Sequence, residues 1–150
     1  MHSTRVARHV EAPRSVVYQA LLNAQAIARW RVPDGMSSHV HEFDARVGGR
    51  FRVSLRYQQS AGTGKSTQNS DTYQGYFAEL VPDEKVVEML EFETADAALA
   101  STMTTTLTDA DPGTNVVVVH AGIPDAIPAD ANEIGTRMAL DNLAELVEGL

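Results

Sequence analysis

The chain has 150 residues, a formal net charge of −8, an apolar content of 43% and no cysteine. These values are typical of one globular domain, here residues 1–150, and they argue against a disordered chain, a disulfide-rich protein and a nucleic-acid-binding protein, which needs a basic face. No stretch is apolar enough to span a membrane or to act as a secretory signal, so we expect a cytoplasmic protein with no membrane partner.

The first part of the chain predicts one strand and two short helices. Residues 4–11 alternate weakly between apolar and polar side chains, which is typical of a strand. Pro13 then fits the start of a helix, where its missing N–H costs nothing. Asn23 ends this helix, and residues 24–30 predict a second one that stops before a Pro-Asp-Gly turn.

From residue 39 onward the apolar period changes to two, which predicts antiparallel strands. The segments with this pattern are residues 39–43, 51–57, 72–80, 85–93, 101–108 and 115–120. The stretch 60–70 is rich in glycine, serine and threonine and predicts a hairpin loop. Gly48 and Gly49 predict a tight turn that needs a positive φ, with a direct ligand contact as the alternative.

The last segment, residues 130–150, predicts the longest helix, with Asp130 as its N-cap. Its apolar stripe consists of Ile134, Met138, Leu143, Leu146 and Val147. The order of elements predicts an α+β fold with a curved, seven-stranded antiparallel sheet. Because a straight helix cannot follow a curved sheet along its whole length, the gap between them is either filled by large side chains or left as a cavity for a small molecule.

Several segments resemble one known family when they are taken in chain order. These are APRSVVYQALLNAQAIARW (12–30), FDARVGGRFRV (43–53), GYFAELVPDEKVV (75–87), the stretch 114–120 with Gly122, and GTRMALDNLAELVEGL (135–150). They resemble the activator of heat-shock-protein-90 ATPase homologue family, within the START-like superfamily, also called SRPBCC. The resemblance implies the helix-grip fold, in which the sheet wraps the C-terminal helix around a deep cavity. Birch-pollen-allergen-like and polyketide cyclase-like members of that superfamily bind lipids, hormones, polyketides or aromatic compounds, and some cyclise or hydrolyse them.

One face of each strand and of the last helix should line such a cavity. The residues expected to contact a ligand are Trp30, Phe51, Val53, Leu55, Tyr57, Phe77, Glu88, Leu90, Met103, Thr105, His120, Ile134 and Met138. Tyr73 joins them if its side chain points to the same face of the sheet.

Three polar residues could carry chemistry there. His120 shares the parity of Val116 and Val118, which predicts an inward imidazole that orients a ligand hydroxyl, acts as a base or is held by structural hydrogen bonds. Glu88 replaces the large apolar residue usual in resembling sequences. Because burying an unpaired carboxylate costs several kcal/mol, Glu88 either has a partner, anchors a ligand, acts as a general base, or is turned outward by a strand bulge. Arg31 stands where those sequences have a second tryptophan, and it either pairs with an anionic ligand group or is solvated.

His39 and His41 alternate along a strand, a spacing at which two imidazoles can share a metal ion. Exposure to solvent explains the same pattern, so we expect neither a metal site nor a cofactor.

The sequence therefore predicts a protein that binds a hydrophobic, aromatic or lipid-like small molecule rather than an enzyme. The first alternative is a cyclase or hydrolase in which His120 and Glu88 act with bound water. The second is a chaperone-associated interaction module in the stress response, as the family name suggests. A homodimer through the exposed sheet or through residues 29–36 is left open.

Overall fold

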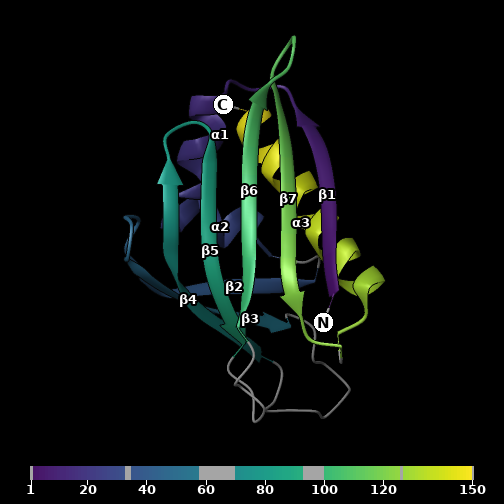
Figure 1. The fold of residues 1–150 in the computed structure, drawn as a ribbon. Helices are drawn as coiled ribbons and strands as arrows, with labels where there is room; N and C mark the ends of the chain where they lie inside the picture. Colours follow the sequence, from purple (N-terminus) through teal and green to yellow (C-terminus); the bar gives the residue numbers. More distant parts are fainter. Residues whose placement is uncertain (1, 33–34, 58–69, 93–99, 126, 150) are drawn as a thin grey trace.

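The computed structural model describes residues 2–32, 35–57, 70–92, 100–125 and 127–149. Within these ranges the elements are β1 (His2–Val10), α1 (Arg14–Leu21), α2 (Ala24–Trp30), β2 (Met36–Phe43), β3 (Arg50–Tyr57), β4 (Ser70–Val81), β5 (Lys85–Phe92), β6 (Ser101–Asp109), β7 (Thr114–Ile123) and α3 (Ala129–Glu148). The predicted order of elements and the α+β class are confirmed (Figure 1). The predicted loop 60–70 lies outside the described residues except for residue 70, which begins β4.

The strands form one antiparallel sheet in the order β1-β7-β6-β5-β4-β3-β2, so that β1 and β2 are its edges. Figure 1 shows the three helices on the same side of the curved sheet. α3 packs mainly on β1, and α2 packs on β2 and α3. This is the helix-grip arrangement that the resemblance implies. Among the described helices, none is long and apolar enough to cross a membrane.

Local sequence signals set the bounds of the two short helices. Pro13 has φ −64 and ψ 153, the extended backbone of an N-cap position, and α1 begins at the next residue. Asn23 caps α2, because its side chain accepts a hydrogen bond from the N–H of Ala26 at 2.9 Å. α2 then buries Ile27 and Trp30 against the core.

The buried stripe of α3 lies further along the helix than the sequence predicts. Its fully buried members are Leu140, Leu143, Ala144 and Val147. Ile134, which was expected in this stripe, is 55% exposed, so this prediction is wrong. At about 100° per residue Ile134 lies roughly 120° around the helix from Leu140 and therefore faces away from the sheet.

The N-cap of α3 is Pro128 and not Asp130, which corrects the second prediction for this helix. Pro128 has φ −62 and ψ 140, the extended backbone that an N-cap needs. Asp130 lies in the first turn, where its Oδ1 accepts a hydrogen bond from the N–H of Ala131 at 3.0 Å. A negative charge in the first turn still interacts favourably with the helix dipole.

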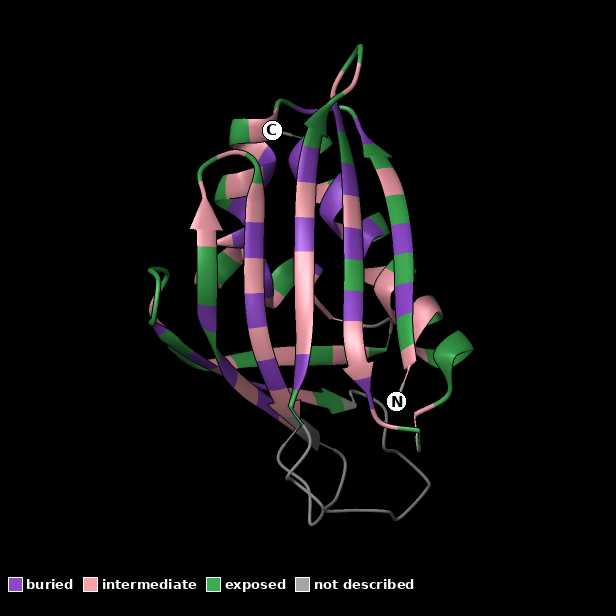
Figure 2. Cartoon of the chain, in the orientation of Figure 1, coloured by how far each residue is buried: buried purple, intermediate pink, exposed green. Residues whose placement is uncertain are grey.

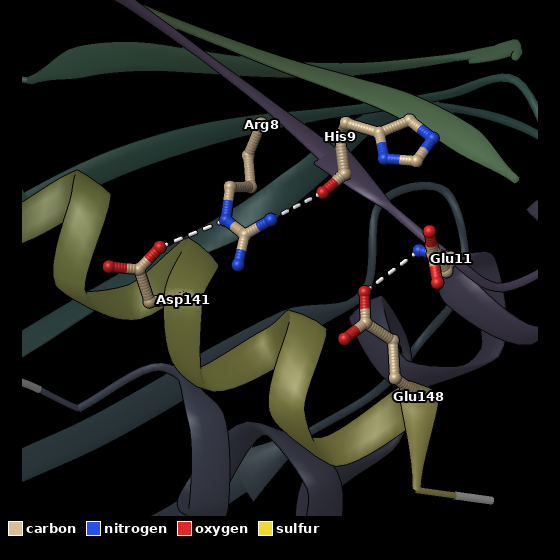
Figure 3. A network of polar contacts seen from close by, with 5 residues as sticks. All are labelled: Arg8, His9, Glu11, Asp141 and Glu148. Atoms are coloured by element: carbon tan, nitrogen blue, oxygen red, sulfur yellow. Dashed lines mark hydrogen bonds and ion pairs between the residues drawn. The ribbon is translucent and has the colours of Figure 1, made fainter.

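Polar contacts join α3 to the edge strand β1 (Figure 3). Nε of Arg8 donates to Oδ1 of Asp141 at 2.9 Å, and Nη1 donates to the carbonyl of His9. Oε2 of Glu148 accepts a hydrogen bond from the N–H of Glu11 at 2.8 Å. Because these contacts are exposed, each contributes little to stability.

The Gly48-Gly49 pair serves the turn before β3. Gly48 has φ +82, so the predicted positive φ is confirmed. A Cβ on Gly49 would overlap the carbonyl oxygen of Asp44. The turn docks on β4, because Gly48 N–H donates to the carbonyl of Phe77 at 2.8 Å and the Gly49 carbonyl accepts from Phe77 N–H at 3.0 Å.

Candidate functional site

A row of side chains crosses the helix-covered face of the sheet. Cross-strand pairing joins, in order, Phe77 of β4, Glu88 of β5, Met103 of β6, His120 of β7 and Thr4 of β1. Glu88, His120 and Thr4 are polar and nevertheless buried. Buried polar groups need partners, so the partners of these three decide what the row can do.

Glu88 is paired with Arg31, which extends inward from the end of α2. Nη1 of Arg31 donates to Oε1 of Glu88 at 2.6 Å, and the two side chains are 15% and 6% exposed. Cζ of Arg31 lies 5.2 Å from the centroid of the Tyr73 ring, a cation–π distance. Nη2 lies 3.8 Å from the sulfur of Met103. We call Arg31, Glu88, Tyr73 and Met103 the Arg31 cluster.

Of the alternatives for Glu88, the structure shows the inward carboxylate with a partner. A bulge does interrupt the neighbouring strand β4, between Phe77 and Glu79, but it does not turn Glu88 outward. The partner of Glu88 is Arg31 of the same chain. Arg31 is therefore not a solvated surface residue, and its charge is already paired before any ligand binds.

The Arg31 cluster is polar but has no net charge at neutral pH. Burial acts to lower the pKa of Arg31, but the adjacent Glu88 carboxylate and Tyr73 outweigh burial, and the pKa is raised. Burial raises the pKa of Tyr73, with Arg31 acting against this shift and Glu88 adding to it. The guanidinium is therefore charged, its carboxylate partner balances it, and the phenol is neutral.

His120 is held by hydrogen bonds at both ring nitrogens. Its Nδ1 lies 2.9 Å from Nδ2 of Asn132, and its Nε2 lies 2.8 Å from Oγ of Ser101. Oδ1 of Asn132 accepts a hydrogen bond from Thr4 at 2.6 Å, which leaves the amide Nδ2 to donate to the imidazole. Nδ1 is then the acceptor, and Nε2 carries the proton and donates to Ser101.

The imidazole of His120 is neutral at pH 7. Burial lowers its pKa to about 4, and the charges of Arg31 and His2 act in the same direction. Since Nδ1 already accepts the Asn132 hydrogen bond, no lone pair is left to accept a proton from a substrate without breaking this network.

His120 and Glu88 face the same interior but are two strands apart. The backbones of such strands lie about 10 Å from each other, and the side chain of Met103 stands between them. Glu88 is hydrogen-bonded to Arg31, and His120 is hydrogen-bonded to Ser101. This arrangement holds each side chain in place and does not favour proton transfer between Glu88 and His120.

The remaining residues expected to contact a ligand differ in burial. Those that are buried in the core are Trp30, Phe51, Val53, Phe77, Leu90 and Thr105. Those that are half-buried are Leu55, Met103 and Met138. Ile134 is exposed, and the side chain of Tyr57 lies outside the described set. Tyr73 is buried and has the same phase as Phe77.

Two hollows formed by described residues lie away from the Arg31 cluster. The larger, about 460 Å³, runs between α2 and β2 and is lined by Ala24, Gln25, Ala28 and residues 38–43. The smaller, about 90 Å³, lies between β1 and α3. None of the residues expected to contact a ligand lines either hollow.

His39 and His41 lie on the wall of the larger hollow. Their rings are 4.6 Å apart, edge to face, and Nε2 of His41 lies 2.7 Å from Oγ of Ser54. Over the described ranges, no three histidine, aspartate or glutamate side chains are grouped so as to hold a metal ion.

The family model described as Activator of Hsp90 ATPase homolog 1-like protein matches residues 11–148. The chain belongs to this family. No curated protein matches it.

Solved structures similar to this member of the Activator of Hsp90 ATPase homolog 1-like family come from several bacteria. Protein CV1439 from Chromobacterium violaceum is 34% identical over 99% of both chains, with a TM-score of 0.88. Mll3558 from Rhizobium loti is 27% identical over 97% of this chain and 96% of its own, with a TM-score of 0.75. The AHSA1-like protein from Aeromonas hydrophila is 17% identical over 98% and 92%, with a TM-score of 0.77, and supports the fold alone.

Sequence analysis of this family member missed the partners that hold the site together. Ser101 shares the inward parity of Met103 and Thr105, a signal that could have identified it. Asn132 and Asn142 are polar residues within an amphipathic helix, which the apolar stripe alone does not single out. Nδ2 of Asn142 donates to the carbonyl of Val32 at 3.0 Å and lies 3.4 Å from that of Trp30, so α3 holds the end of α2 from which Arg31 extends.

Proposed function

We propose that this protein binds a small, mostly apolar organic molecule, aromatic or lipid-like, between the sheet and α3, with one uncharged oxygen of the ligand held by Arg31. Residues 1–150 act as one domain of a cytoplasmic protein in this proposal. The observation that carries it is a guanidinium inside the helix-grip interior, ion-paired on one side and 15% exposed.

Arg31 has more donors than its partners use. A guanidinium carries five N–H groups in a fixed fork. Within the described chain one donates to Glu88 and another points at the sulfur of Met103, a weak acceptor. A ligand oxygen is a stronger acceptor than a thioether sulfur, so it would replace the contact with Met103.

The ligand oxygen should be uncharged, which refines the sequence-based hypothesis of an anionic group. Glu88 already balances the charge of Arg31. A ligand carboxylate about 4 Å from Glu88 would be repelled by about 4 kcal/mol at an effective dielectric constant of 20, which cancels most of its attraction to Arg31 and leaves the cost of removing its charge from water uncompensated. A hydroxyl or carbonyl oxygen accepts the same hydrogen bond without this repulsion.

Room for the ligand would come from Met103. This side chain is half-buried, unbranched and packed at the centre of the polar row. Methionine adapts to irregular spaces more readily than branched side chains. Its displacement from Arg31 would open the space between β6 and α2, with Tyr73 as an aromatic wall.

Thermal unfolding with three matched probes tests the proposal: naphthalene, 1-naphthol and 1-naphthoate. We expect 1-naphthol to raise the Tm most, because it combines an apolar body with an uncharged oxygen. At a concentration about 100 times its Kd, a ligand stabilises by about 2.7 kcal/mol, which corresponds to roughly 5–11 °C for a chain of this size.

Two variants locate the binding site. Arg31→Met should remove the preference for 1-naphthol over naphthalene. Ala28→Phe fills the hollow between α2 and β2 and should leave the shift unchanged. If Ala28→Phe abolishes the shift and Arg31→Met does not, the ligand occupies that hollow instead. No shift with any probe would contradict binding of this class of ligand.

The other two hypotheses have less support. A catalytic role for His120 and Glu88 would require both to leave their present partners. A chaperone-associated role rests on the family name, and copurification with a heat-shock-protein-90 ATPase would be needed to support it.

A further inference from the structure

The sheet has a second face, which none of the described helices covers. All three helices lie on the opposite side (Figure 1). Along the central strands, buried positions alternate with less buried ones, as Figure 2 shows. Away from the strand ends, the less buried side chains on this face of β5, β6 and β7 form what we call the outer patch: Val87, Met89, Thr102, Thr104, Thr106, Val117 and Val119.

The outer patch is uncharged, although the chain as a whole carries 20 acidic and 12 basic residues. Its charged neighbours are Arg5 on β1, Glu79 on β4, and Lys85 and Glu91 near the two ends of β5. Val119, at 36%, is one of the large apolar side chains that the fold leaves exposed. An uncharged surface of this kind on an acidic protein is a candidate interaction site.

The register of the sheet gives this surface an internal symmetry. One cross-strand row reads Arg5, Val119, Thr104, Val87, Glu79 from β1 to β4. Valine flanks the central threonine on both sides, and the two ends carry opposite charges. If a second copy of the row is laid over it in the opposite order, valine therefore faces valine and each charge faces an opposite charge.

We propose that a second copy of this chain docks on the outer patch, sheet against sheet, about a two-fold axis parallel to β6. This axis places β1 of one copy over β4 of the other. Thr104 then meets its own counterpart, Val119 meets Val87, and Arg5 meets Glu79 at both ends.

The physical chemistry of sheet packing supports this pairing. Two sheets pack face to face at about 10 Å, with their strand directions within about 30° of each other and with side chains of the two faces interdigitating. Valine and threonine suit such a surface, because they are stiff and lose little freedom on packing. Glu79 contacts Lys85 of its own chain through Oε1 at 3.1 Å and its side chain is 51% exposed, so the proposed contact with Arg5 of the second copy would use Oε2.

A matching partner of another sequence would need the same row in reverse, with an anion opposite Arg5 and a cation opposite Glu79. A second copy meets this requirement through symmetry alone, and the contact is closed, so it ends at two chains.

Sedimentation equilibrium over a range of concentrations tests the proposal, with far-UV circular dichroism to confirm that each variant is folded. We expect the wild-type chain to dimerise. Val119→Lys should raise the dimer dissociation constant at least about tenfold, because it places a charge in an uncharged interface. Ile134→Lys, on the exposed side of α3, is the matched control and should leave dimerisation unchanged.

A mixing experiment tests the two-fold axis itself. Arg5→Glu and Glu79→Arg each place like charges opposite each other in their own homodimers, so each variant alone should be monomeric. Mixed in equal amounts, they should form a heterodimer, because both contacts then join opposite charges. A wild-type chain that stays monomeric, a Val119→Lys dimer as tight as wild type, or a mixture that stays monomeric would each overturn the proposal.

Discussion

The buried ion pair between Arg31 and Glu88 makes a quantitative prediction about stability. The pair joins Nη1 to Oε1 at 2.6 Å, with side chains 15% and 6% exposed. Removing one member of such a pair leaves an uncompensated buried charge and typically costs about 3–5 kcal/mol. We therefore expect Glu88→Leu and Arg31→Met each to lower the free energy of unfolding by about this amount.

The double variant Arg31→Met/Glu88→Leu should be much more stable than the sum of the single losses predicts. Replacing both charges by apolar side chains leaves no buried charge, and such replacements are often neutral or stabilising. The Coulomb energy of unit charges about 4 Å apart is about 4 kcal/mol at an effective dielectric constant of 20. We expect a coupling energy of about 3 kcal/mol, at the upper end of measured values.

Urea denaturation at pH 7 measures these energies. The single tryptophan, Trp30, is 5% exposed and directly precedes Arg31, so its fluorescence reports on this region. Circular dichroism gives an independent probe of global unfolding, and an unchanged m value validates the comparison. If the two single losses simply add in the double variant, the pair does not stabilise the fold in the way described.

Three further predictions about stability concern His120, the glycine positions and Asn142. In the folded protein the pKa of His120 is about 4, below its usual value near 6.5. About 3 kcal/mol of stability that is present above pH 6.5 is therefore lost as the pH falls toward 4. We expect His120→Gln to flatten this part of a profile of unfolding free energy against pH. Gly75→Ala should lower the free energy of unfolding in urea by about 1–3 kcal/mol or more, because the added Cβ would overlap the carbonyl oxygen of Met89. In Gly48→Ala the added Cβ meets no atom, and we expect a loss of about 1–2 kcal/mol from the φ of +82 alone. Asn142→Leu should cost about 1–3 kcal/mol, because it leaves carbonyls at the end of α2 without their donor.

Each of these has an outcome that would contradict it. A His120→Gln profile as steep as wild type would mean that another group titrates. A Gly75→Ala variant no less stable than Gly48→Ala would mean that β4 and β5 separate easily. For Asn142→Leu, unchanged stability together with unchanged Trp30 fluorescence would show that water replaces the amide at no cost.

Local pattern was sufficient for the elements because each depends on neighbours in the chain. Asn23 caps α2, and the two-residue period from β2 to β7 follows the alternation of a half-buried sheet. The errors arose where several local solutions exist. Ile134 fits an apolar stripe as well as Leu140 does, and only the contact of α3 with β1 decides which stripe is buried.

The sequence by itself determined the order of strands and helices, the family and the inward phase of His120, because these depend on short-range periodicity and on segments in a fixed order. It also singled out Arg31 and Glu88, each as a separate anomaly. Only the tertiary structure made them partners, across 57 positions of the chain, just as it joined His120 to Ser101 and Asn132. The physical reason is that a buried charge is compensated by whatever the fold brings within hydrogen-bonding distance, and that distance is set by the packing of α2 and α3 against the sheet.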